Sequence, residues 1–154
     1  MTRKIIAATL SLLVGVVLLA SPAEAAHRGL RIYEHSWNGV TVHVKIIVNQ
    51  SDVQIGKFEG LADAYEFTNP DVGADPDIRY DWIHLRKDGV LVAQTSSASG
   101  WMDLNTSYST PWYDSLCQND PRFQTTARYQ IRYNHGAGNL SPWYTNKSYD
   151  WLCN

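Results

Sequence analysis

The clearest alternation of hydrophobic and polar positions lies near the C-terminal end of the chain. Tyr129, Ile131 and Tyr133 recur at every second residue, and the residues between them are polar. Because successive side chains of a β-strand point to opposite faces, this period predicts a strand with its bulky residues facing the core. The Gly-rich stretch 136–138 then ends the strand, and Ser-Pro-Trp at 141–143 begins another extended segment.

The same period of two appears earlier, in Thr41–Val48. The residues of this segment that are expected to face inward are Val42, Val44, Ile46 and Val48. Turn-forming residues occupy 49–52, and Gln54–Glu59 is the predicted hairpin partner. The following stretch 69–77 is so rich in Asp, Pro and Gly that we expect it to be irregular and to separate the two halves of a domain.

A second hairpin is predicted in the middle of the chain. Tyr80–Lys87 and Val90–Ala93 are extended segments joined by Asp88-Gly89, which is a strong signal for a two-residue turn. Gly100–Leu104 is expected to be another short extended piece, and a long loop runs from there to Phe123. Since no helical period or internal repeat is present, the pattern predicts an all-β fold, an antiparallel β-sandwich.

The first 25 residues have the composition of a secretory signal peptide. A basic start, Thr2-Arg3-Lys4, precedes the apolar run Ile5–Ala20, and Ala23-Glu24-Ala25 offers a cleavage site with small residues. The run is shorter than the roughly 20 residues that span a bilayer, which disfavours a retained membrane anchor. We therefore expect a secreted chain with one domain at 26–154, without membrane insertion after cleavage and monomeric.

Charge narrows the classes of partner. The full chain has 13 basic and 15 acidic residues, and loss of the signal segment leaves 11 and 14, a net charge of −3. Nucleic-acid binding requires a strongly basic footprint, so this weakly acidic balance argues against a nucleic-acid partner. The remaining candidates are a glycan or an extracellular protein.

Cys117 and Cys153 are the only cysteines, and both follow the signal segment. In an oxidising compartment two such thiols are expected to form one disulfide, worth about 2 to 4 kcal/mol of stability. A catalytic cysteine is the alternative, but neither thiol lies in a sequence typical of a nucleophile.

Three motifs give a resemblance to a known family. His84–Ala93, Gly100–Leu104 and Thr126–Trp143 occur in the order found in fibronectin type III domains of secreted bacterial proteins. The resemblance covers about Tyr80 to Trp143, and it implies an immunoglobulin/fibronectin III-like sandwich with Tyr129 as the strand tyrosine. It also implies a binding scaffold more than a catalyst. The long insertion before Phe123, the added disulfide and the lack of an early core tryptophan depart from the family.

A candidate binding surface follows from the expected pairing of the strand Tyr80–Lys87 with the strand that contains Tyr129. If Ile83 and Leu85 face inward together with Tyr129, the residues between them share an outer face that is aromatic and basic. Arginine and tryptophan are frequent at binding hot spots, although an ordinary solvated face is the plainer interpretation. The candidate residues on this face are Trp82, His84, Arg86, Arg128 and Arg132.

Six tryptophans and nine tyrosines also invite a carbohydrate-binding interpretation, because planar rings stack on sugars. We expect about half of them to be core residues in a sandwich of this size. Trp112 and Tyr113, beside Pro111 in the predicted loop, are the pair that we would place at an exposed site. Trp101, Trp143, Tyr144 and Trp151 are further candidates.

No cofactor or metal is predicted. Asp71, Asp75 and Asp77 have oxygen ligands suited to Ca²⁺, but their spacing fits no defined calcium loop, and an acidic turn explains them equally well. The histidines lack the spacing of a zinc site, and no recognised catalytic motif occurs. We therefore predict no enzymatic activity and no catalytic residue.

These observations favour a secreted, non-catalytic extracellular binding protein whose ligand is a polysaccharide or a cell-envelope glycan. One alternative is a secreted protease inhibitor or effector that acts through the loop 105–123. A small secreted hydrolase is another, in which Glu34, Glu59 or Glu66 and a distant Asp form the pair of carboxylates.

Overall fold

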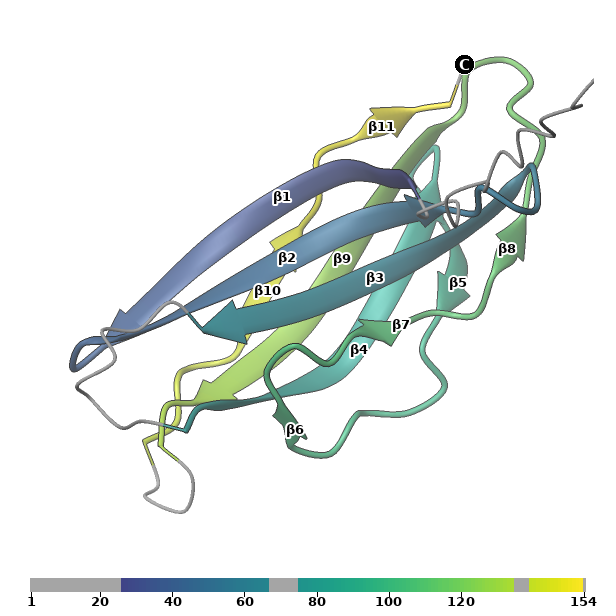
Figure 1. The fold of residues 1–154 in the computed structure, drawn as a ribbon. Helices are drawn as coiled ribbons and strands as arrows, with labels where there is room; N and C mark the ends of the chain where they lie inside the picture. Colours follow the sequence, from purple (N-terminus) through teal and green to yellow (C-terminus); the bar gives the residue numbers. More distant parts are fainter. Residues whose placement is uncertain (1–25, 67–74, 135–138, 154) are drawn as a thin grey trace, which may run out of the picture.

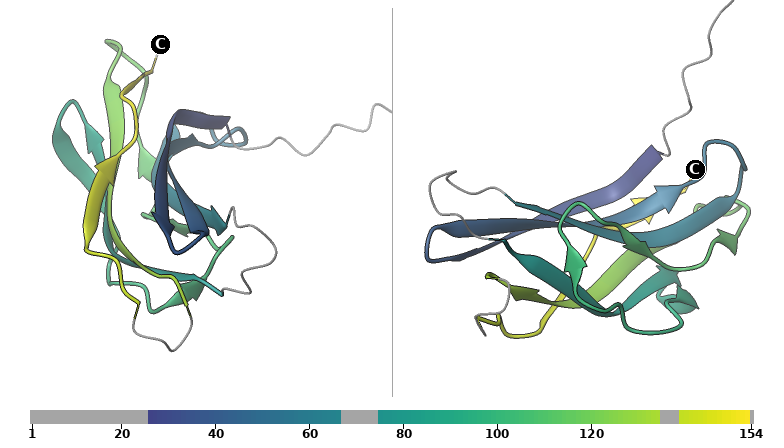
Figure 2. Two further views of the ribbon diagram at one scale, coloured as in Figure 1. Left: turned by 90° about the vertical axis from the view of Figure 1, so that its left-hand side faces the viewer. Right: turned by 60° about the horizontal axis from the view of Figure 1, so that its bottom comes forward.

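A computed structural model describes residues 26–66, 75–134 and 139–153. The described chain forms two antiparallel sheets that pack as separate layers (Figures 1 and 2). This confirms the predicted antiparallel β-sandwich. The predicted signal segment and Asp71 lie outside the described residues, and no described helix is long and apolar enough to cross a membrane.

The first sheet contains the three long N-terminal strands in chain order. They are β1 (Ala26–Trp37), β2 (Val40–Gln50) and β3 (Lys57–Glu66), and the short strands β7 (Tyr108–Ser109) and β8 (Tyr113–Asp114) both pair with β3. Val42, Val44, Ile46 and Val48 are fully buried, which confirms the inward face predicted for this segment.

The second sheet has the order β10-β9-β4-β5. Its strands are β4 (Asp77–Lys87), β5 (Val90–Gln94), β9 (Arg122–Arg132) and β10 (Tyr144–Lys147). Two short strands complete it, β6 (Met102–Asp103) on β4 and β11 (Trp151–Leu152) on β9. The predicted hairpin across Asp88-Gly89 is the β4–β5 hairpin.

Side chains from both sheets form two adjoining clusters in the core. The larger one packs Val42 and Val44 of β2 against Tyr80 and Ile83 of β4 and Tyr129 of β9. The smaller one lies around Phe58 and Phe123, whose rings stack with centroids 4.3 Å apart. The apolar faces of the two sheets are therefore buried against each other, and burial of this kind is the main source of stability.

The disulfide joins Cys117 to Cys153, as the sequence predicted, with the two Cα atoms 5.2 Å apart. Cys153 is buried in the smaller cluster, so the link fixes the C-terminal segment where β9 begins. The described structure contains no free cysteine.

Strand β1 was not predicted, although its signal is present in the sequence. The Asn38-Gly39 turn has positive φ at both residues, 46° and 82°, which is the geometry of the two-residue turn that Asn-Gly favours. At the other end of β1, a Cβ at Gly29 would collide with the carbonyl oxygen of Tyr149. Only glycine allows this approach, through which β1 reaches the C-terminal segment.

Several predicted boundaries were wrong. Strand β4 begins at Asp77 and not at Tyr80, and β2 extends through Gln50 into the predicted turn. The hairpin partner of β2 begins at Lys57 and not at Gln54, because Val53 and Ile55 are 82% and 96% exposed in a turn. The stretch 105–123 is not one long loop. It contains β7 and β8, and the backbone amides of Asn105, Thr110 and Ser115 donate to carbonyl groups of β3 and of Gly56 just before it.

Candidate functional site

Arginine and tryptophan side chains alternate across the outer face of the second sheet. The guanidinium group of Arg79 lies between two indole rings, 4.8 Å from the centroid of Trp101 and 4.8 Å from that of Trp143. The guanidinium group of Arg128 lies 5.0 Å from the ring centroid of Trp143, and that of Arg132 lies 4.6 Å from the ring centroid of Trp101. We call these five residues the Arg–Trp ladder. Each cation–π contact is worth about 0.5 to 1 kcal/mol at a site exposed to water.

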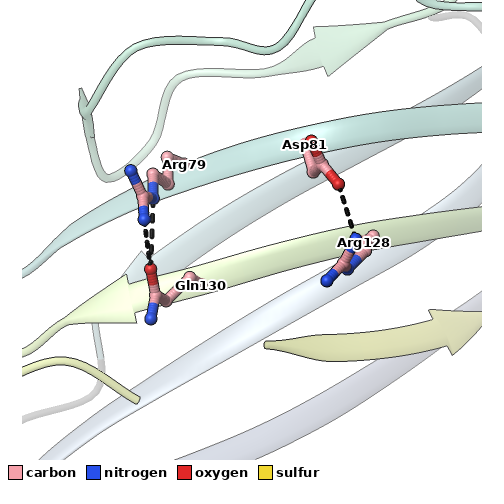
Figure 3. A network of polar contacts seen from close by, with 4 residues as sticks. All are labelled: Arg79, Asp81, Arg128 and Gln130. Atoms are coloured by element: carbon pink, nitrogen blue, oxygen red, sulfur yellow. Dashed lines mark hydrogen bonds and ion pairs between the residues drawn. The ribbon is translucent and has the colours of Figure 1, made fainter. Parts of the chain in front are cut away.

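Polar partners fix the three arginines of the ladder. Both Nε and Nη2 of Arg79 donate to Oε1 of Gln130, and Nη1 of Arg128 donates to Asp81 at 2.9 Å (Figure 3). Arg132 donates from Nε to Asp77 at 2.8 Å and forms an ion pair with it through Nη2. The ladder is therefore ordered before any ligand binds.

The two ion pairs differ in burial. The side chain of Asp77 is 3% exposed and that of Arg132 is 18% exposed, whereas Asp81 and Arg128 are 37% and 40% exposed. Water screens the second pair much more than the first, so the first pair contributes more to the geometry of the ladder. Asp77, one of the three aspartates considered for calcium, is engaged by Arg132. No group of three or more potential metal ligands occurs among the described residues.

The predicted residues of β4 lie next to the ladder. Trp82 pairs with Arg128 across the strands, and its ring stacks on His84 with the centroids 4.1 Å apart. Partial burial, and secondarily the charge of Arg86, lowers the pKa of His84 below its usual value. Arg86 itself donates to the carbonyl oxygen of Gly89 in the adjacent turn. The structure thus brings Trp82, His84 and Arg86 onto the same outer face as Arg128 and Arg132.

Trp112 and Tyr113 do not join this surface. Tyr113 belongs to β8, which pairs with Phe58 of β3 at the edge of the first sheet, and Tyr113 packs partly against the smaller core cluster. Trp112 beside it is 43% exposed. Trp112 and Tyr113 therefore lie on the other sheet from the predicted residues of β4 and β9, while Trp151 packs against the smaller core cluster.

A pocket of about 320 Å³ opens at one end of the sandwich, and we call it the end pocket. It lies where the β1–β2 hairpin meets the connection between β9 and β10. Trp37 stacks on Tyr133 there, with centroids 6.0 Å apart and an interplanar angle of 27°. The described residues that line it are Ser36, Trp37, Tyr133, Asn139, Leu140, Ser141, Pro142 and Tyr144.

A partly buried polar network supports this pocket from the core side. His35 stacks on Tyr144 at 3.9 Å, and its Nε2 lies 2.7 Å from the hydroxyl oxygen of Tyr129, which also accepts a hydrogen bond from Asn146. Burial lowers the pKa of His35 and raises the pKa values of Tyr129 and Tyr133 well above their usual range. These groups are therefore neutral at pH 7.

Sequence reasoning missed Arg79 of the ladder and the role of Asp77 and Asp81 as its ion-pair partners, and it did not consider Trp37. Asp77 and Arg79 alternate with the apolar residues Ile78 and Tyr80, so extending the predicted strand backwards from Tyr80 would have revealed them. The Asn38-Gly39 turn would have revealed the strand that carries Trp37. Trp101 lies outside any regular strand, so no period predicted its contact with Arg79.

Comparison with known proteins gives no assignment, because no family model, no curated protein and no solved structure matches this chain. The candidate site must therefore be interpreted from its own geometry.

Proposed function

We propose that this chain is a secreted, non-catalytic binding protein that recognises a polysaccharide or a cell-envelope glycan through the outer face of its second sheet. The observation that carries the proposal is the Arg–Trp ladder, in which three guanidinium groups are held in place by two indole rings. Tryptophan 143, at 37% exposure, offers ring surface to a sugar.

Charge on this face favours a glycan that carries carboxylate or phosphate groups. Arg79 and Arg86 have no acidic partner among the described residues, in contrast to Arg128 and Arg132. The face therefore has a cationic excess although the chain as a whole is acidic. Guanidinium groups bind such anions in a planar, bidentate way.

Preorganisation supports binding as well. A ligand that engages flexible arginines must order them, at about 0.5 to 1.5 kcal/mol for each side chain. Stacking on Trp101 and Trp143 and hydrogen bonding to Gln130 already restrict these side chains. Ligand binding on this face therefore costs less conformational entropy than binding by arginines that are free to rotate.

Several further features belong to the same proposal. A disulfide is typical of exported proteins, which agrees with the secretory signal predicted from the sequence. We also propose that the scaffold is fibronectin type III-like, as the sequence motifs around the Asp88-Gly89 turn between β4 and β5 imply. We propose that the mature domain acts as a monomer without a cofactor.

The test is binding of the purified mature chain to soluble polysaccharides by isothermal titration calorimetry. Polygalacturonate and wall teichoic acid are the acidic probes, and a mixed-linkage glucan is the neutral one. We expect Trp143→Ala to weaken binding of the acidic probes at least tenfold, because it removes the ring that contacts both Arg79 and Arg128. Trp112→Ala, which removes a tryptophan of similar exposure from the other sheet, is the matched control and should leave binding unchanged.

Absence of binding to both acidic probes would overturn the proposal. Loss of binding in Trp112→Ala but not in Trp143→Ala would move the site to the first sheet. The inhibitor alternative has its own test, inhibition of a panel of proteases by the purified chain. Because β3 uses backbone groups of 105–115, we expect no inhibition.

A further inference from the structure

The end pocket is separate from the ladder, and different residues form it. Its lining residues come from the end of β1, from Tyr133 just after β9 and from the segment 139–144, whereas the arginines of the ladder lie on the outward face of β4 and β9. Its volume of about 320 Å³ is near the lower end of the range for small-ligand pockets, roughly 300 to 1,000 Å³. A pocket of this size suits one small molecule or one unit of a polymer.

One wall of the pocket is a tryptophan ring with a rigid backing. Tyr133, which is 5% exposed, stacks against Trp37, which is 40% exposed. A planar aromatic surface held in this way offers a stacking platform that loses little freedom when a ligand binds. A second aromatic residue, Tyr144, is held by its stack on His35.

Hydrogen-bonding groups lie beside these rings. The hydroxyl group of Ser36 lies 2.9 Å from that of Thr41, and Asn139 is fixed by its backbone carbonyl, which accepts from the amide of Tyr133. The side-chain amide of Asn139 has no partner among the residues that the structure describes. It can both donate to and accept from a ligand hydroxyl. Ser141 instead has a scaffold role, because its hydroxyl accepts from the amide of Ile131.

Charge distinguishes the pocket most clearly. None of its described lining residues carries a charged side chain, and burial raises the pKa of Tyr133, so that this phenol is neutral at pH 7. A charged ligand would lose hydration there without gaining an opposite charge from these residues, which is costly. A ligand with hydroxyl groups and an apolar ring face fits the hydrogen-bonding groups and Trp37 together.

We propose that the end pocket is a second binding site, which takes a single ring of a neutral saccharide stacked on Trp37 with its hydroxyl groups bonded to Ser36 and Asn139. This site does not depend on the ladder, and it remains if the ladder binds no glycan.

The experiment uses the full mature chain and a set of neutral hexasaccharides, namely cellohexaose, laminarihexaose, xylohexaose and mannohexaose. Binding is measured by calorimetry and by changes in amide chemical shifts. We expect at least one of them to bind and Trp37→Ala to weaken it about tenfold or more. Trp37→Phe keeps a ring and should retain part of the affinity. Trp112→Ala, which removes a tryptophan of similar exposure outside both the pocket and the ladder, is the matched control and should bind the same hexasaccharide with unchanged affinity.

Each other result contradicts the proposal. Failure of all four hexasaccharides to bind would overturn it, whether or not polygalacturonate binds to the ladder. Binding that Trp37→Ala leaves intact would place the saccharide elsewhere. Phosphocholine is included because aromatic pockets also bind quaternary ammonium groups, and its binding in preference to the saccharides would replace the assignment. A thermal unfolding curve for Trp37→Ala that matches the wild type shows that any loss is local.

Discussion

The outer face of the second sheet and the end pocket both contain tryptophan rings in contact with another side chain, but the two regions differ in charge. The partner of tryptophan is arginine on the outer face and tyrosine in the end pocket. On the outer face, indole rings separate arginines whose charges are partly matched by Asp77 and Asp81. In the end pocket, Trp37 rests on neutral Tyr133, and no described lining residue is charged. Aromatic content alone therefore does not identify a ligand, because the side chains that contact the rings determine which charge a ligand can carry.

Among the tests of this comparison, removal of the Asp77 side chain is expected to change the free energy of unfolding most. Asp77→Ala leaves Arg132 partly buried without its ion-pair partner, and breaking a buried pair costs about 3 to 5 kcal/mol. Asp81→Ala, the matched change in the exposed pair, should cost less than about 1 kcal/mol. Urea unfolding of both variants gives the two free energies. Equal losses would mean that burial does not distinguish the two ion pairs.

Loss of the disulfide should be the next largest effect, and it should leave both regions functional. Cys117→Ser combined with Cys153→Ser is expected to lower the free energy of unfolding by about 2 to 4 kcal/mol, chiefly through the greater freedom of the unfolded chain. The disulfide lies where β9 begins, and the pocket lies beyond its other end. Guanidinium unfolding measures the loss. Calorimetry in buffer without denaturant should give unchanged affinities, and a selective loss at one region would show that it depends on the link.

Salt should weaken ligand binding at the ladder more than at the end pocket, and this effect is smaller than the two losses of stability above. Raising NaCl from about 50 to about 500 mM is expected to weaken polygalacturonate binding to the ladder about tenfold, because exposed charges are screened. Binding of a neutral hexasaccharide in the end pocket should change less than about twofold. Calorimetry at the two salt concentrations measures both. A pocket affinity that falls with salt would contradict the neutral assignment.

The smallest expected effect is a dependence of stability on pH that comes from the pocket side. Burial lowers the pKa of His35 in the folded state below its value in the unfolded chain, near 6.5. The unfolded chain therefore binds the proton more readily, and stability is lost as the pH falls below about 6.5. We expect the loss between pH 7 and pH 5 to be smaller in His35→Phe, which keeps a ring against Tyr144. His84→Phe is the control, since water screens the more exposed His84, and urea unfolding at each pH is the measurement.

The parts of the fold that the sequence predicted are those set by local periods. The inward residues of β2 and β9 and the Asp88-Gly89 hairpin follow from alternation and turn chemistry, which act over a few residues. Strand β1 was missed because Gly29 and Leu30 form a bulge that interrupts its alternation. The pairing of β7 and β8 with β3 depends on contacts between distant segments, which no local pattern encodes.

The candidate site was predicted in part for the same reason. Arg128 and Arg132 alternate on β9, so their shared face followed from the period of a strand. Trp101 and Trp143 reach the ladder from segments outside the strands, and the two ion pairs depend on the register between β4 and β9. A bulge between Tyr80 and Trp82 sets that register, and a single sequence does not reveal which residue bulges.

Strand β9 and Tyr133, the residue that follows it, supply both regions, because alternate residues of an extended chain point to opposite faces. Arg128 and Arg132 point outward to the ladder, whereas Tyr129 and Tyr133 point inward to the core and the pocket. Insertion or deletion of one residue within β9 would exchange these two sets and bring the arginines into the core. Substitutions can therefore alter either region alone, but the number of residues between Ala127 and Tyr133 must stay constant during the evolution of both.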